Sequence, residues 1–337
     1  MPSKRIEKDF IHYQSAHCES GSTSNLLLNY GLAVSEPLVF GIGSGIFFGY
    51  FPFIKVHGLP LITYRTVPGR ILKNTAKRLG IGIESMKFRD SEKAMDTLDE
   101  MIDRGVPVGL RTGVYWLPYL PDAMRFHFNA HMIIAYGKKG DDYLISDPVL
   151  DGPVVCHRRD LMKARFAEGM LAPKGRMFYL TDVPEGVGLP GAILKGTRET
   201  CRMMLKAPAP AGVRGIKTFA RVLRQWPEKH GKRKALLYLG HTIRMQEEIG
   251  TGGGGFRLIY AAFLQEAAHI LKEDRFLEIS KRMTDIGDTW RNFALVGSRI
   301  CKNRSSEGEN YDRLSEILLD CAGKEYRLFK DLWDVVR

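Results

Sequence analysis

The pattern of hydrophobic residues changes near residue 188, and this change constrains the fold more than any other feature. Residues 10–181 mix strand-like and helical segments, whereas helical periodicity dominates from about residue 214 to the end. A chain of 337 residues also exceeds what a single hydrophobic core usually encloses. We therefore expect two domains, 1–187 and 188–337, with the boundary near 182–190.

The first domain is expected to belong to the α+β class. Helices come first and most strands later, unlike the alternation of a doubly wound fold. The expected helices cover residues 17–30, 68–79, 91–104 and 159–166. The expected strands cover residues 106–110, 131–136, 143–146, 154–157 and 176–180. The turn sequence GKKGDD joins two of these strands into a hairpin, and Ser91 is the expected N-cap of its helix.

The second domain is expected to be all-helical. Its predicted helices cover residues 214–226, 233–248, 256–272, 275–295 and 311–333. Because the loops between them are short, the helices should pack as a bundle.

The composition argues against several classes of protein. The longest apolar stretch, 37–54, is broken by four glycines and Pro52, so no run reaches the roughly 18 residues of a membrane span. The N-terminal segment MPSKRIEKDF has no apolar export signal, which leads us to expect a cytoplasmic protein. The five cysteines are scattered without a CxxC pair, which argues against a disulfide framework or a zinc site. The GIGSG segment lacks the strand–loop–helix setting of a dinucleotide site, so we expect neither metal nor cofactor.

Cys18 is the candidate nucleophile. It lies in HCESGSTSN at the start of an expected helix, whose positive end favours a thiolate. His131 opens one strand of the predicted hairpin and Asp147 follows the other, so both are expected at the same end of the sheet. Taken singly, these are more often a core cysteine, a strand histidine and a turn aspartate. Together they have the order of a Cys–His–acid triad, in which the carboxylate orients the imidazole.

The motifs HCESGSTSNLLLNYG, LAVSEPLVFGIGSGIFFGY, HFNAHMIIAYG and LISDP resemble the family of butirosin biosynthesis protein H, and TGGGGFRLIYAAFLQEAA extends the resemblance into the helical region. The resemblance implies a papain-like domain followed by a helical domain, with Cys18, His131 and Asp147 as the triad. It also implies an acyltransferase of secondary metabolite biosynthesis, which moves an acyl group from a carrier-protein thioester to an amine. A peptidase or amidase with the same triad is the alternative, and a non-catalytic binding protein is a third.

Four further residues complete the expected site. The Cys18 backbone N–H should donate to the oxyanion, with Gln14 or His17 as the second donor. Papain-like enzymes place the corresponding Gln farther from the Cys than Gln14 lies. Glu36 is either a surface acid or a pocket carboxylate for a cationic amine. Tyr115, in the aromatic segment TGVYWLPYLPDAMRFHF, either lines a substrate channel or packs in the core.

Two glycine-rich segments have a structural and a functional interpretation. The glycines of GIGSG are expected to let the backbone pass close to the catalytic helix or the substrate. The TGGGG run before residue 256 either offers N–H groups to an anion or serves as a hinge.

The net charge of +12 is concentrated in the second domain. Residues 195–244 contain 13 basic and 2 acidic side chains. They form either a solvated face or a surface that attracts an acidic partner over about 8–10 Å. Because no nucleic-acid-binding motif accompanies them, the expected partners are an acidic acyl carrier protein and a small amine or peptide substrate.

Overall fold

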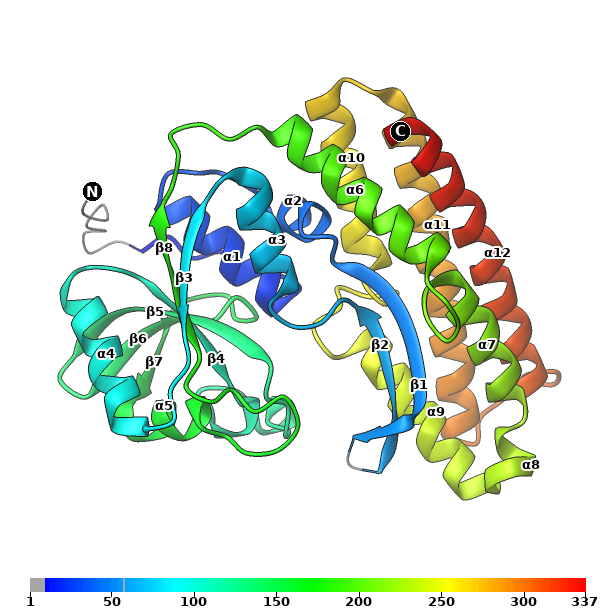
Figure 1. Cartoon of the computed structure of the whole chain (residues 1–337). Coiled ribbons are helices and arrows are strands. Elements are labelled where there is room, and N and C mark those ends of the chain that lie inside the picture. Colours follow the sequence, from blue (N-terminus) through cyan, green and yellow to red (C-terminus); the bar gives the residue numbers. More distant parts are fainter. Residues whose placement is uncertain (1–9, 57) are drawn as a thin grey trace. The chain divides into compact units, whose positions relative to one another are not determined.

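The computed structural model describes residues 10–56 and 58–337, which form two compact units (Figure 1). The first unit comprises the residues up to Val39 and Leu72–Gly188, and the second comprises Phe40–Ile71 and Leu189–Arg337. The α+β class predicted for the first part and the helical class predicted for the last part are confirmed. Residues 40–71, which the sequence assigned to the first domain, belong instead to the second unit.

A β-hairpin explains this correction. It consists of β1 (Ile46–Val56) and β2 (Leu59–Arg65), which pair antiparallel. The rings of Phe48 and Tyr64 lie 5.8 and 5.6 Å from the ring of Trp290, in the helical unit. The hairpin therefore buries its aromatic face against helices that lie more than 200 residues later in the chain. An apolar run shows that a segment will be buried, but not which of two cores will receive it.

The first unit is built on a six-stranded antiparallel sheet with the order β3–β8–β4–β5–β6–β7. Its strands are β3 (Gly82–Met86), β4 (Val108–Thr112), β5 (His131–Lys139), β6 (Asp142–Ser146), β7 (Val154–His157) and β8 (Met177–Asp182). The predicted β5–β6 hairpin is confirmed, with Ile134 opposite Ser146. Strand β3 was not predicted, because its short GIESM sequence is only partly buried and has no clear alternation.

The helices of this part are α1 (Cys18–Asn29), α2 (Glu36–Ile42), α3 (Arg70–Leu79), α4 (Ser91–Asp103) and α5 (Arg158–Arg165). The four that the sequence predicted lie within two residues of their expected bounds; α2 was not predicted. The N-cap of α4 is Asp90 and not Ser91, because the Asp90 carboxylate accepts the Lys93 N–H at 3.0 Å.

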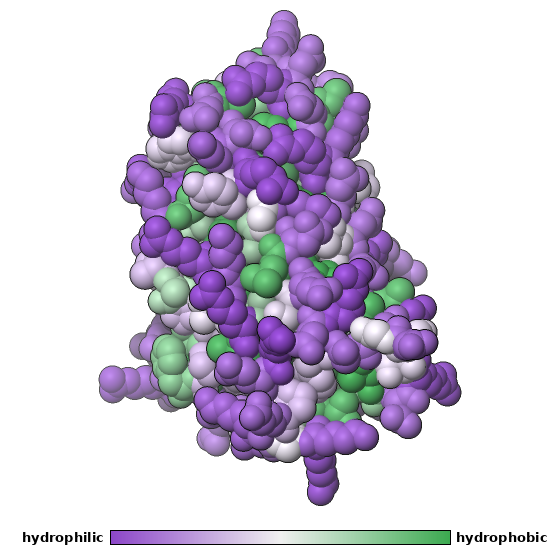
Figure 2. Space-filling model, turned by 90° about the vertical axis from the view of Figure 1, so that its right-hand side faces the viewer, coloured by the Kyte–Doolittle hydropathy of each residue, from purple (hydrophilic) through white to green (hydrophobic). Residues whose placement is uncertain are grey.

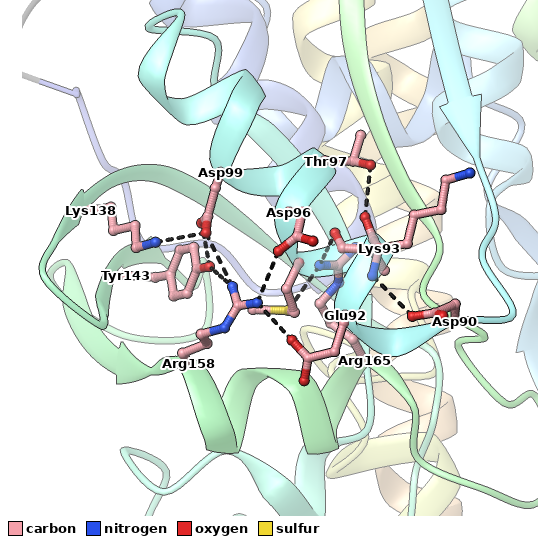
Figure 3. A network of polar contacts seen from close by, with 12 residues as sticks. Asp90, Glu92, Lys93, Asp96, Thr97, Asp99, Lys138, Tyr143, Arg158 and Arg165 are labelled. Carbon is pink, nitrogen blue, oxygen red and sulfur yellow. Dashed lines mark hydrogen bonds and ion pairs between the residues drawn. The ribbon is translucent and has the colours of Figure 1, made fainter.

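A polar network holds α4 to the sheet (Figure 3). Arg158 donates to Asp99 and Glu92 of α4 at 3.1 and 2.9 Å. Asp99 also accepts from Lys138 at 2.7 Å and from the Tyr143 hydroxyl. Because Lys138 stands at the opposite end of β5 from its first residue, the network lies about 20 Å along the strand from that residue.

The second unit consists of the β1–β2 hairpin and seven helices among the described residues: α6 (Leu189–Lys206), α7 (Gly212–Arg224), α8 (Trp226–His230), α9 (Lys232–Glu247), α10 (Arg257–Leu271), α11 (Asp274–Cys301) and α12 (Tyr311–Val336). The five predicted helices are confirmed. Helix α6 was missed because glycines and a proline interrupt its periodicity.

A buried ion pair lies in the helical core. The guanidinium of Arg257 donates to Glu325 at 2.9 Å, and both side chains are fully buried. The Trp290 indole N–H donates to the same carboxylate at 2.7 Å.

Figure 2 shows one face of the molecule, where hydrophilic side chains predominate and hydrophobic ones form small separate areas. Within the described part of the chain, no helix combines the length and the apolar character needed to cross a membrane.

The GIGSG segment makes a close backbone approach within the second unit. Gly196 of α6 passes the backbone of this segment, where an added Cβ would lie 2.7 Å from the Gly41 carbonyl oxygen and 2.8 Å from the Ile42 Cα. The Ser44 hydroxyl donates to the Gly196 carbonyl at 3.0 Å. The expectation that these glycines let the backbone pass close to the catalytic helix or the substrate stays a prediction.

Candidate active site

Cys18 is the first residue of α1 and is only 7% exposed. Its N–H belongs to the first helical turn, where backbone donors have no intrahelical partner. His17 is the N-cap, and its imidazole accepts the Ser20 N–H at 3.4 Å. The local sequence therefore places the thiol at the positive end of a helix, as predicted.

Glu36 holds the segment that precedes Cys18. One carboxylate oxygen accepts the Ala16 N–H at 2.9 Å, and the other accepts the His17 N–H at 2.7 Å and the Ser20 hydroxyl at 3.1 Å. Burial raises the pKa of Glu36, and these three hydrogen bonds oppose that rise. The expectation of a surface acid is corrected, because the side chain is half-buried and its carboxylate binds the chain itself. Contact of Glu36 with a cationic amine stays a prediction.

His131 is the first residue of β5, and β5 lies against α1. The Ser22 hydroxyl of α1 donates to the Met132 carbonyl at 3.0 Å, which fixes the helix to the strand next to His131. On the other side, Thr112 of β4 is the pairing partner of His131. His131 is 5% exposed, so its imidazole lies in a buried setting.

Asp147 directly follows β6 and is fully buried. Its Oδ2 lies 2.7 Å from His131 Nε2. The side chain of Cys18 also raises the pKa of His131, which places the thiol beside the imidazole, and Asp147 occupies only Nε2 of the ring. The structure thus brings together the three residues that the sequence predicted as a triad, although they lie up to 129 residues apart in the chain.

The electrostatics of His131 follow from these partners. Burial lowers the pKa of His131, but the charge and hydrogen bond of Asp147, together with the hydrogen bond and charge of Cys18, raise it to about 10. The imidazole therefore keeps its second proton at neutral pH. A cationic donor beside a cysteine sulfur favours the thiolate form.

Sequence reasoning missed two residues around Asp147. The Tyr119 hydroxyl donates to Asp147 Oδ2 at 3.1 Å, and nothing in its aromatic, Pro-rich segment distinguished it from its neighbours. The ring nitrogens of His12 lie 2.8 Å from the Ser146 hydroxyl and 3.0 Å from the Leu150 carbonyl oxygen. His12 therefore fixes the turn that carries Asp147 from the N-terminal side.

The two candidate oxyanion donors have partners within the chain. Gln14 is exposed, and its amide nitrogen lies 3.4 Å from the Val149 carbonyl oxygen. The His17 backbone N–H is bound by Glu36, and its imidazole caps α1. A second oxyanion donor from either residue stays a prediction.

Tyr115 is 38% exposed, so the expectation of core packing is excluded for this side chain. Its ring stacks on His127 with 4.4 Å between centroids, and the Arg125 guanidinium lies 5.7 Å from it. Contact with substrate stays a prediction.

The N–H groups of the last three glycines of the TGGGG run donate to acceptors of the same unit. The Gly254 N–H lies 3.2 Å from a carboxylate oxygen of Glu247, and the Gly253 N–H lies 3.1 Å from the Thr251 hydroxyl. The anion bound by the Gly254 N–H is thus the Glu247 carboxylate of the chain itself. Among the described residues, no group of three or more His, Cys, Asp or Glu side chains is arranged to hold a metal ion.

A cysteine at a helix N-terminus, packed against an antiparallel sheet that presents histidine and aspartate at one end, is the arrangement of the papain-like cysteine enzymes. The first unit has this fold. Residues 17–148 match the family model described as butirosin biosynthesis protein H, N-terminal. Residues 159–332, slightly more than half of the chain, match that of a domain of unknown function (DUF4872). The chain therefore belongs to the family that these two domains define, that of butirosin biosynthesis protein H, which its motifs predicted.

A crystal structure from Bacillus anthracis, described as a C39-like peptidase, is similar to the chain at 15% identity with a TM-score of 0.37. The match covers 53% of this chain and 98% of that one. No curated protein sequence matches the chain significantly.

Proposed function

We propose that the first unit catalyses cysteine-dependent acyl transfer in secondary metabolite biosynthesis. Cys18 is the nucleophile, His131 transfers protons and Asp147 orients His131. The observation that carries the proposal is the buried hydrogen bond between His131 and Asp147, 2.7 Å long, with Cys18 at the start of α1 acting on the same imidazole. Membership of the family supports a thioester as the acyl donor and an amine as the acceptor.

The reaction begins with the Cys18 thiolate and the His131 imidazolium. The sulfur attacks the thioester carbonyl carbon, and the Cys18 N–H at the start of α1 donates to the developing oxyanion. The carbon–sulfur bond to the donor breaks, and the departing thiolate takes the proton of His131. An amine then attacks acyl-Cys18, His131 removes one amine proton, and the amide leaves as the Cys18 thiolate and the imidazolium are restored.

The competing reaction is hydrolysis, in which water replaces the amine. Exclusion of water from the acyl-enzyme separates the two outcomes. All three triad side chains are at most 7% exposed, which favours transfer. A peptidase or amidase remains the alternative, and a specific acceptor assay distinguishes the two.

The first test measures thiol reactivity at pH 7. Burial raises the pKa of each of the other four cysteine thiols, to about 12 for Cys156. Iodoacetamide should therefore label Cys18 about tenfold or more faster than any other cysteine. His131→Ala should remove most of this advantage, whereas His269→Ala, an exposed histidine of α10, should preserve it. Equal labelling of all five cysteines would exclude an activated nucleophile.

The second test identifies the reaction. Incubation with a small acyl thioester should add the acyl mass to Cys18, detected by mass spectrometry, and Cys18→Ala should abolish the addition. Release by added amines with formation of amide supports transfer. Release by water at the same rate with and without amine identifies a hydrolase.

The basic segment 195–244 supports an acidic carrier protein as the thioester donor. The cations of α7 at 214, 217, 221 and 224 recur at helical spacing and are exposed. Lys232, Arg233 and Lys234 are exposed at the start of α9. Such a face increases the rate of encounter with an acidic partner, and added salt weakens that effect.

Charge reversal of Lys232, Arg233 and Lys234 to Glu should raise the apparent KM for acyl-carrier protein and leave transfer from a small thioester unchanged. The matched control reverses three exposed basic residues outside the segment, Lys281, Lys302 and Arg304. Increasing ionic strength should slow only the carrier-dependent reaction. If both donors respond alike, the segment is a solvated face and carrier docking is abandoned, while the role of Cys18 is unaffected.

A further inference from the structure

The buried carboxylate of Asp147 accepts three hydrogen bonds, and only one of them comes from His131. Oδ2 lies 2.7 Å from His131 Nε2 and 3.1 Å from the Tyr119 hydroxyl. Oδ1 accepts the Val149 N–H at 3.2 Å. Tyr119 and His131 therefore bind the same oxygen, and the negative charge on that oxygen is divided between two donors.

We propose that Tyr119 is a positioning residue that competes with His131 for Asp147 and thereby limits how tightly His131 holds its proton. The proposal rests on the proposed function of the triad and adds a residue that sets the basicity of His131. General acid–base catalysis is most efficient when the catalytic group gives up its proton readily near the working pH. A histidine bound to an unshared carboxylate in a buried site would hold its proton too tightly to give it to the leaving group.

The physical basis is competition between hydrogen bonds. A donor to a carboxylate stabilises its charge and weakens its attraction for other cations. Burial, followed by the charge and hydrogen bond of Asp147, raises the pKa of Tyr119 well above its ordinary value. The hydroxyl therefore stays protonated and donates throughout the range in which His131 titrates.

The chain path makes this contact specific. Tyr119 lies in the loop between β4 and β5, between the short helices Val114–Trp116 and Asp122–Met124. The same loop ends at His131, so the Tyr119 hydroxyl closes the loop back on the carboxylate that its last residue needs. The path of this loop therefore sets the positions of both the Tyr119 hydroxyl and the His131 imidazole.

Other ionisable groups on the elements packed against β5 are accounted for. Next to His131 they are Cys18 and Glu19 of α1, Arg111 of β4 and Asp147 after β6. The others are Tyr136, Lys138 and Lys139 of β5, Asp142 and Tyr143 of β6, and Glu92, Lys93, Asp96, Asp99, Glu100 and Asp103 of α4. Among the causes of the His131 pKa shift, only Asp147 and Cys18 act as charged or hydrogen-bonded partners. A change at Tyr119 should therefore reach His131 through Asp147.

The test is an NMR titration of the full chain with 15N-labelled histidine, in which His131→Ala assigns the resonance. Tyr119→Phe should raise the pKa of His131 by roughly half a unit to one unit, because His131 is then the one remaining donor of the two that share Asp147 Oδ2. The matched control is Tyr143→Phe, which removes a similar Tyr–Asp hydrogen bond at the far end of β5 (Figure 3) and should leave the pKa of His131 unchanged.

A second variant gives the opposite sign and avoids a cavity or a folding defect. Site-specific replacement of Tyr119 by 3-fluorotyrosine makes the hydroxyl a stronger donor, so the pKa of His131 should fall. An unchanged or lowered pKa in Tyr119→Phe, or an unchanged one with fluorotyrosine, overturns the proposal. Failure of the proposed function is recognised separately, because slow iodoacetamide labelling of wild-type Cys18 would contradict it whatever His131 does.

Discussion

Replacing Asp147 by Asn tests the electrostatics of the triad with an almost unchanged side-chain shape. The pKa of His131 is raised from 6.5 to about 10, against the opposing effect of burial. This difference corresponds to roughly 5 kcal/mol in favour of the imidazolium. Without the carboxylate charge, burial dominates, and His131 becomes largely neutral at pH 7.5.

Asparagine also conflicts with the donors around it. Both oxygens of Asp147 accept hydrogen bonds, from Val149, Tyr119 and His131. The NH2 group of Asn must face at least one of these donors, and an unsatisfied buried group costs about 1–3 kcal/mol. If the NH2 group faces His131, the imidazole takes the wrong tautomer for accepting a proton from Cys18.

The assay is the rate of Cys18 labelling by iodoacetamide between pH 6.5 and 9. We expect Asp147→Asn to slow labelling at pH 7 by about tenfold or more, because the cationic donor beside the sulfur is lost. Circular dichroism verifies folding, and Asp151→Asn, an exposed aspartate of the same unit, serves as the control. A wild-type labelling rate in folded Asp147→Asn would refute the role of the carboxylate.

The same variant has a signature in stability. Because the pKa of His131 is higher in the folded chain, its contribution is fully present below pH 6.5 and is lost as the pH rises to about 10. The wild-type melting temperature should therefore fall across this pH window, and the melting temperature of Asp147→Asn should fall less steeply. Parallel pH profiles for the two proteins would contradict the assigned coupling.

Two further predictions concern the anchors of each unit. Glu36→Gln puts an amide NH2 against backbone donors, so it should cost about 1–3 kcal/mol and slow the labelling of Cys18; wild-type values in both a melting curve and the labelling assay would refute its positioning role. Arg257→Met leaves the buried Glu325 carboxylate without its cationic partner and should destabilise the protein by about 3–5 kcal/mol, whereas the double variant Arg257→Met/Glu325→Leu should regain most of that stability in thermal unfolding. Equal melting temperatures for the single and double variants would show that the unpaired Glu325 charge is not what destabilises the single variant.

The sequence predicted what is local. Periodicity located the helices and the β5–β6 hairpin, because amphipathic patterns repeat over a few residues. Placing His131 at the start of one hairpin strand and Asp147 after the other implied their proximity, since antiparallel pairing brings these ends together. Cys18 could be nominated because a helix N-terminus is visible in the sequence.

What only the tertiary structure decided depends on contacts between distant segments. Residues 40–71 belong to the second unit, and an apolar run does not encode which of two cores it joins. Glu36 became an anchor because α2 meets the segment before Cys18, and Gly254 binds Glu247 because the glycine run folds back on α9. Tyr119 reaches Asp147 through a loop without periodicity, so no pattern in the sequence marks it. Long-range pairing of polar groups is specified by the whole fold, because burial obliges each donor to find whichever acceptor the packing brings near.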